Sequence, residues 1–269
     1  MYWILIIVSG VVTIFSTFWF RECYAPVILE VKTQKLRQEL GREDLTSKLA
    51  LQVTGLELLK VSLVRPLKLL TRSPIVFLTA LYVATIYGML YLLFTTVNTM
   101  FVDQYGFSVQ ISGLPFIGFA IGMISALLLL MATQDKTVAR LRAKNNNVFE
   151  PEMRLVNLVY VALWVCPGLF MYGWSAEYKV HWIVPVLALV LYGFGQVAIF
   201  MGTLTYAVDS FPQYAASAVA AVSFLRSLVG TFLPFAGPPL YSSLGYGWGN
   251  TVLGFIAVAL TPMIILFQR

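Results

Sequence analysis

An arginine stands near the middle of a run of small and apolar residues at 215–237. On a helix that starts at Ala215, Arg226 lies about 16 Å along the axis, close to the centre of a bilayer. An unpartnered arginine at that depth costs at least about 2.5–3.5 kcal/mol. We therefore expect it to face neighbouring helices and to contact carbonyls, hydroxyls, water or a carboxylate. Two interpretations remain open: a charge that lines a cavity for a substrate or proton, or an internal tie between helices.

The nearest acidic residue, Asp209, comes where the preceding apolar run ends. We expect it at the membrane edge, too shallow to contact Arg226 unless its helix bends. A carboxylate is favoured at a helix N-terminus, so Asp209 is predicted to act as a cap or gate residue for the next helix. Small residues recur beside Arg226 at spacings of three or four, which lets another helix approach closely. They are Ala216, Ala220, Ser223, Ser227 and Gly230.

Two other apolar runs carry polar and aromatic residues at helical spacing. Each set falls on one face of its helix. Such faces suit a wet cavity for an amphipathic organic molecule, although ordinary hydrogen bonding between helices explains them equally well. The sets are Tyr87, Tyr91, Thr95 and Asn98 in one run, and Tyr192, Gln196 and Thr203 in the other.

Enzyme and metal motifs are scarce. His181 is the only histidine, which excludes a two-histidine metal site, and beside Trp174 and Trp182 it suits an interfacial aromatic belt. Two cysteines, Cys23 and Cys166, are expected to stay unpaired. We therefore predict no catalytic residues, no metal site and no cofactor.

The composition is that of an all-α, polytopic membrane protein. Of 269 residues, 59% are hydrophobic and 11% charged, and the mean hydropathy is +0.82. Soluble proteins carry about 25% charged residues. Seven stretches are long enough to cross a bilayer as helices, and Pro167 and Pro234 within them are expected to be tolerated. These predicted transmembrane helices are 2–20 (a retained span rather than a signal peptide), 75–97, 111–132, 155–173, 182–205, 215–237 and 248–267.

The basic residues are unevenly distributed between the connecting segments. Ten of the 18 Lys and Arg fall in 21–73 and five in 133–154, whereas the loops on the other side hold only Lys179. Cytoplasmic loops carry the excess of Lys and Arg, so we expect the N-terminus outside and the C-terminus in the cytosol. The net charge of +6 is thus a topology signal, and nucleic-acid binding is disfavoured.

The segment 21–73 is too long for a simple turn. Pro26 can open a helix and Gly41 can close one. Another helix is expected to begin at Pro66. Apolar residues recur at helical spacing between these points, which predicts one or two amphipathic helices on the membrane surface; a solvated linker is the alternative. The apolar positions are Leu45, Leu49, Val53, Leu56 and Leu63, with Lys48, Glu57 and Lys60 on other faces.

Several stretches resemble one known family, the fungal drug:proton antiporters (multidrug or polyamine exporters) of the major facilitator superfamily. "VDSFPQYAASAVAAVSFLRSLVGTFLPFAGPPLYSSLGYGWGNTVLGFIAVAL" is similar to its last two spans, and "RPLKLLTRSPIVFLTALYVATIYGMLYLLFTTVNTMFVDQYGFS" resembles its seventh span. "YGWSAEYKVHWIVP" and "ECYAPVILEVKTQKLRQELG" are similar to a later loop and to the central loop. The resemblance implies that 1–20 is the sixth span, 21–73 the central cytosolic loop and 74–269 the six-helix second half of a twelve-span fold.

The resemblance also implies a function. The family exports drugs, polyamines or other small organic molecules in exchange for protons, so a proton gradient is the expected driving force and a plasma membrane the expected site. For Arg226 the resemblance implies a structural and gating role. Asp135, Lys136 and Arg140 match a degenerate cytosolic latch motif, in which Met131 replaces the family's glycine.

The first five spans of the family have no counterpart, so we expect a truncated chain that does not transport alone. A non-transporting fragment or pseudogene product is the alternative. A seven-helix receptor is disfavoured by the long basic segment after the first span. Besides the lipid bilayer, the partners expected are a small organic substrate and the missing N-terminal half.

Overall fold

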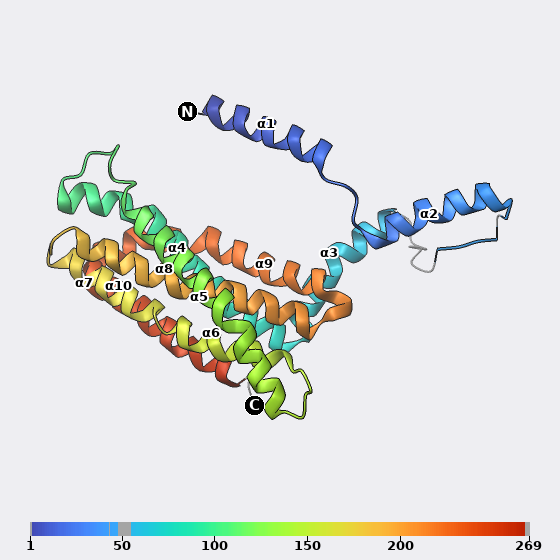
Figure 1. The fold of residues 1–269 in the computed structure, drawn as a ribbon. Helices are drawn as coiled ribbons and strands as arrows, with labels where there is room; N and C mark the ends of the chain where they lie inside the picture. Colours follow the sequence, from blue (N-terminus) through green and yellow to red (C-terminus); the bar gives the residue numbers. More distant parts are fainter. Residues whose placement is uncertain (1, 43, 48–54, 267–269) are drawn as a thin grey trace. The chain divides into compact units, whose positions relative to one another are not determined.

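The computed structural model of the protein describes residues 2–42, 44–47 and 55–266, and these are helical without any β-strand (Figure 1). The predicted all-α class is confirmed. The chain divides into two compact units, Met1–Lys60 and Val61–Arg269, which are described separately. The domain boundaries 1–20, 21–73 and 74–269 remain predictions.

The first unit contains two helices and the start of a third. Helix α1 spans Tyr2–Trp19, and α2 spans Ala25–Leu40. The predicted signals around α2 are confirmed: Pro26 lies in its first turn, and Gly41 ends it in the left-handed conformation with φ 63°. Only glycine adopts that conformation without a steric cost. None of the residues of α2 is buried in its own unit.

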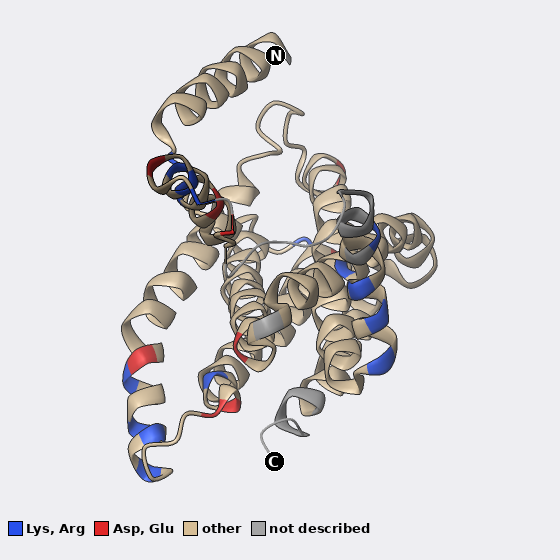
Figure 2. Cartoon of the chain, turned by 90° about the vertical axis from the view of Figure 1, so that its right-hand side faces the viewer, with Lys and Arg blue, Asp and Glu red and all other residues tan. Residues whose placement is uncertain are grey.

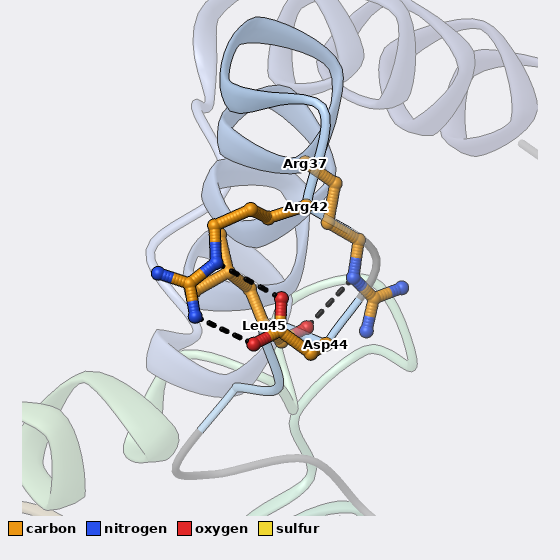
Figure 3. Close-up of polar contacts among 4 residues, drawn as sticks. All are labelled: Arg37, Arg42, Asp44 and Leu45. Carbon is orange, nitrogen blue, oxygen red and sulfur yellow. Dashed lines mark hydrogen bonds and ion pairs between the residues drawn. The ribbon is translucent and has the colours of Figure 1, made fainter.

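After α2 the chain forms a polar loop instead of continuing as a helix. Arg42 donates to Asp44 from Nε at 3.1 Å and from Nη2 at 2.6 Å, and Arg37 Nε donates to the Leu45 carbonyl at 2.7 Å (Figure 3). The predicted helical position of Leu45 is therefore wrong, because these bonds hold it in the loop. The Arg42 guanidinium also holds the pKa of the Asp44 carboxyl below its usual range. Lys48, Leu49 and Val53 lie outside the described residues.

Helix α3 spans Gly55–Arg72 and crosses the boundary between the two units. It carries Pro66 within it, so the helix start predicted at Pro66 is wrong. Ser73 ends this segment and begins the next, since its hydroxyl accepts a hydrogen bond from the Val76 amide and Pro74 occupies the first turn of α4. This is a standard capping arrangement that satisfies a free N–H group.

The remaining helices form a bundle in the second unit, and each of the seven predicted spans overlaps a helix. Within the described residues, five stretches are long and apolar enough to cross a membrane, while α1 supplies a shorter apolar helix, Trp3–Trp19. The elements are α4 (Pro74–Tyr105), α5 (Pro115–Lys144), η1 (Pro151–Arg154), α6 (Leu155–Ala162), α7 (Val165–Glu177), α8 (Ile183–Ser210), η2 (Pro212–Tyr214), α9 (Ala215–Phe232), η3 (Leu233–Ala236) and α10 (Gly237–Leu266).

Pro167 and Pro234 alter the helices locally, but the predicted spans continue through them, as expected. Pro167 lacks an N–H, and its ring conflicts with the carbonyl four residues earlier, at Leu163. The chain leaves the helix at Leu163–Trp164, between α6 and α7. Pro234 lies in η3, where the helix tightens after Phe232. The spans persist because each break is short and the helix resumes at once.

The last candidate span, Ala215–Pro262, has 48 residues, about 72 Å as a straight helix and over twice the bilayer core. It is not straight. Gly245 has φ 71° and ψ 175°, and the Tyr241 hydroxyl donates to Asn250 Oδ1 at 3.2 Å across it. Nine residues of helix rise about 13.5 Å, so this bond shows that the chain turns back. The loop predicted at 238–247 is thus a turn centred on one residue.

Close contacts between helix pairs hold the bundle together. The main pairs are α5 with α8, α4 with α9, and α7 with both α8 and α10 (Figure 1). Glycines mark the crossing of α5 and α8. A Cβ on Gly193 would lie 2.5 Å from the Phe119 carbonyl oxygen, and one on Gly122 would overlap the Val190 carbonyl. Small residues permit such approach between helices in membranes.

Most of the cations of the second unit gather at the end of the bundle that faces the viewer in Figure 2, whereas Lys179 lies between α7 and α8 and Arg226 lies within α9. At that end the Arg65 guanidinium lies 5.0 Å from the Tyr214 ring, and Arg154 forms an ion pair with Asp209. At the other end, the Tyr105 hydroxyl donates to the Ser175 carbonyl at 3.0 Å. The arrangement agrees with the charge asymmetry of the sequence, and the orientation in a membrane remains a prediction.

Replacing Gly122 by alanine should destabilise the bundle by about 1–3 kcal/mol, because the new methyl group meets backbone at the α5–α8 crossing. The thermal midpoint of the purified chain in detergent measures the effect. Gly113→Ala is the matched control, since a Cβ there has no heavy atom within 4 Å. Equal midpoints for the two variants would contradict the close crossing.

Candidate functional site

Arg226 of α9 lies over two aromatic rings that come from two other helices. Its guanidinium carbon is 4.7 Å from the ring centre of Tyr87 in α4 and 5.1 Å from that of Phe200 in α8. The two rings contact each other edge to face at 5.2 Å. We call Arg226, Tyr87 and Phe200 the Arg226 cluster.

The packing of α9 on α4 brings the cluster together. Gly88, next to Tyr87, leaves room for Val229 and Leu233: a Cβ on Gly88 would lie 2.9 Å and 2.7 Å from their side chains. Gly230 likewise accommodates the Tyr91 ring, at 2.8 Å from its would-be Cβ. Helices that approach this closely let Arg226 reach the ring of Tyr87.

Aromatic faces, rather than a carboxylate, are the partners that the structure gives Arg226. The ion pairs among the described residues are Arg42–Asp44 and Arg154–Asp209, and neither involves it. A cation–π contact contributes about 0.5–2 kcal/mol, depending on its exposure, and partly buried Arg226 has two. That is comparable with the cost of an arginine at mid-membrane depth. The sequence did not predict this partner.

The polar stripe of α4 lies at an open face of the bundle. Tyr87 is partly buried, whereas Tyr91, Thr95 and Asn98 are exposed. The Thr95 hydroxyl donates a hydrogen bond to the Leu92 carbonyl of its own helix at 2.8 Å. Only Tyr87 of this stripe joins the Arg226 cluster, with the Tyr91 ring 6.3 Å from it.

The polar stripe of α8 is buried instead. Tyr192 and Gln196 are 1% exposed and Thr203 is 3% exposed. The Tyr192 hydroxyl donates to the Ile86 carbonyl of α4 at 2.8 Å, while the Gln196 amide has no hydrogen-bond partner within the described part of the chain. The Tyr192 hydroxyl thus joins α8 to α4, and the cavity role of this stripe stays a prediction.

Phe200 is the member of the cluster that the sequence analysis missed. It follows Gln196 by four residues and therefore lies on the same face of α8 as Tyr192 and Gln196. An aromatic residue that continues a polar stripe at this spacing was the available signal. It was overlooked because phenylalanine in a span is usually a packing residue.

Asp209 neither contacts Arg226 nor caps the next helix. It lies in the last turn of α8 and pairs with Arg154 Nε at 2.5 Å. The residue before α9 is Tyr214, which makes no side-chain cap hydrogen bond. The cap prediction is wrong, because Asp209 lies within α8 and its carboxylate pairs with Arg154. Gln134 Nε2 also donates to the Arg154 carbonyl at 3.0 Å, so this pair joins α5, η1 and α8.

The proposed latch residues Asp135, Lys136 and Arg140 are exposed on α5 and form no ion pair with another described residue. Their latch role stays a prediction. Nearby, Asn157 Nδ2 donates to Thr137 Oγ1 at 3.0 Å. The small-residue stripe of α9 splits: Ala216, Ala220 and Ser227 are exposed and Ser223 is partly buried, whereas Gly230 is buried under Tyr91.

Aromatic residues cluster at the opposite end of the bundle, around His181. The His181 ring lies 5.4 Å from Trp182, and Trp174 lies 5.6 Å from Trp248. The position suits the predicted interfacial belt. Cys23 and Cys166 are both free, exposed and buried respectively. Among the described residues, no three His, Cys, Asp or Glu side chains gather in a way that could hold a metal ion.

Comparison with known proteins bears on this arrangement. The sequence profile of the Major Facilitator Superfamily matches residues 1–234, which is most of the chain. The chain belongs to the major facilitator superfamily. It is therefore an integral, multi-pass membrane protein of a transporter family, and not an enzyme. No solved structure shows significant similarity to it.

Fungal members of the superfamily are similar over nearly the whole chain. It is 47% identical to the MFS-type transporter penM of Penicillium rubens, over 99% of this chain and 52% of that protein. It is 42% identical to the MFS-type transporter tndD of Aspergillus flavipes, over 97% and 49%, and 41% identical to the MFS transporter cpaT of Aspergillus oryzae, over 99% and 54%. The chain thus spans about half the length of the curated relatives it matches.

The Arg154–Asp209 ion pair should make a measurable contribution to stability, because both side chains are more than two-thirds buried. A double-mutant cycle with Arg154→Met and Asp209→Asn should give a coupling of about 0.5–3 kcal/mol in the free energy of unfolding. The exposed pair Arg42→Met and Asp44→Asn is the control, with a coupling near zero expected. A coupling no larger than in the control would contradict the interpretation.

Proposed function

We propose that this chain is the second half of a fungal drug:proton antiporter, which exports small organic molecules, among them drugs or polyamines, from the cytosol across the plasma membrane. The N-terminus lies outside and the C-terminus inside. Membership of the superfamily and the charge asymmetry of the two bundle ends support this proposal.

The Arg226 cluster is the observation that carries the proposal. It joins α4, α8 and α9 at one point in the bundle, next to the open face with Tyr91 and Ser227. A guanidinium held by aromatic rings keeps hydrogen-bond donors free for a polar group of a substrate, and the rings offer apolar contact. Charged residues inside membrane spans are expensive and usually functional. We propose that this cluster forms one wall of the substrate path.

Export requires a second wall. The relatives are about twice as long as the matched region, and transporters of this type alternate access by rocking two repeats about a central site. We propose that Arg226 faces that central site, and that this chain does not transport without a first half. The proton-binding carboxylate is proposed to lie in that first half, since Asp209 is already committed to Arg154.

The residues of the Penicillium rubens relative that precede its matched region can be fused to the start of this chain. In yeast that lacks its own drug pumps, the chimera should lower the accumulation of rhodamine 6G, and a protonophore should abolish that effect. The chain alone should not lower it. Efflux by the chain alone would contradict the need for a first half. A chimera that is inactive at normal abundance, beside an active Penicillium rubens protein, would contradict the proposed function.

In the same chimera, Arg226→Gln should reduce the initial rate of efflux at least about tenfold, because it removes the charge between the rings. Arg226→Lys should be intermediate, since an ammonium keeps the charge but lacks the planar stacking face of guanidinium. Lys179→Gln, at the opposite end of the bundle, is the matched control and should leave efflux unchanged. Wild-type efflux in both Arg226 variants, at equal abundance in the membrane, would show that the cluster is a structural tie.

A further inference from the structure

A hollow of about 340 Å³ opens beside α3 at the basic end of the bundle, away from the Arg226 cluster. Three cations of α3 line it, spaced so that they lie along one edge of the helix. The remaining walls come from the junction with α4 and from η2. The lining residues are Arg65, Lys68, Leu69, Arg72, Ser73 and Tyr214.

The cations around this hollow lack acidic partners. Arg65, Lys68 and Arg72 are exposed, and none of them forms an ion pair with another described residue. Arg65 lies over the Tyr214 ring at 5.0 Å, which holds its guanidinium at the rim. Three like charges on one helix edge repel each other unless an anion binds between them. The cluster therefore favours a negatively charged group.

Burial on the opposite side of α3 places this edge beside the bundle. On the side of α3 that faces the bundle, Pro66 and Leu70 are buried and Leu69 is partly buried. Ser73 then turns the chain into α4. These buried residues and the contact of Arg65 with the Tyr214 ring place the cations beside η2.

A third edge of α3 distinguishes between possible sources of an anion. Leu63, Val64 and Leu67 are 63%, 51% and 46% exposed, and they continue around the helix from the cationic edge. A helix with an exposed apolar edge beside a basic edge lies in the membrane interface, with the apolar side chains among the acyl chains. A free phosphate ion would contact only the basic edge, whereas a phospholipid would contact both edges.

We propose that the hollow formed by Arg65, Lys68, Arg72 and Tyr214 binds the headgroup of an anionic phospholipid, whose acyl chains lie along Leu63, Val64 and Leu67. Basic clusters next to spans attract anionic lipids with about 1 kcal/mol per cation. The proposal concerns the surface of the bundle and does not depend on the transport function.

Binding can be measured on the full chain, purified in a neutral detergent, with short-chain phosphatidylserine and phosphatidylcholine of the same acyl length. We expect phosphatidylserine to bind at least about tenfold more tightly. Lys68→Gln with Arg72→Gln should weaken it by about 30-fold, as expected for two cations. Arg140→Gln with Lys144→Gln removes the same charge from α5 and is the matched control, with less than a threefold change expected. Circular dichroism and the thermal midpoint check that both double variants are folded.

A second variant tests the lipid against other anions. Leu63→Ser with Leu67→Ser should weaken phosphatidylserine binding several-fold and leave any binding of inorganic phosphate unchanged. Equal losses in the two charge variants would overturn the proposal in favour of diffuse attraction. It would also be overturned if inorganic phosphate bound as tightly as phosphatidylserine, or if a poly-glutamate peptide competed with the lipid at lower concentration, which would indicate a free anion or an acidic protein segment.

Discussion

The cost of placing charge in a medium of low dielectric governs where this protein keeps its ionic groups. Arg226 is a cation inside a span, and its partners are the faces of aromatic rings instead of an anion. A buried ion pair has to overcome the desolvation of two charges. The aromatic arrangement desolvates only one, and it leaves the guanidinium donors available to another molecule.

Satisfying that one cation depends on close helix packing. Tyr87 reaches Arg226 because Gly88 and Gly230 let α4 and α9 approach, and Phe200 reaches it because α8 is tied to α4 by the Tyr192 hydroxyl. Small residues likewise let α5 pack closely against α8. Stability and the geometry of the site therefore rest on the same small residues, so a substitution at such a glycine affects both.

Much of the fold could be predicted from the sequence, because the bilayer limits the choices. A stretch of about 20 apolar residues must be helical, and the unequal distribution of cations between the loops predicted the two ends of the bundle. Boundaries depend on local chemistry that composition does not reveal. Leu45 lies outside its predicted helix because Arg37 and Arg42 organise a loop, and the span that contains Pro167 has a short irregular turn at Leu163–Trp164.

The site was predicted only in part, since periodicity places a residue on a face but does not say what covers that face. The stripes of α4 and α8 were found, yet one is exposed and the other buried. Asp209 was expected at a helix start, and its partner came from η1, 55 residues earlier in the chain. Phe200 was missed because its role depends on a cation from a third helix.

The turn at Gly245 leaves the last two membrane segments joined by a single residue with non-helical backbone angles. Glu177 Oε2 accepts a hydrogen bond from the Gly247 amide at 3.2 Å, and Gly245 has no room for a side chain beside that carboxylate. Such a short connection does not allow one of the two segments to insert into the membrane while the other stays in water. During synthesis, the segment before Gly245, which includes α9, and the rest of α10 after it should therefore enter the bilayer together, as one helical hairpin.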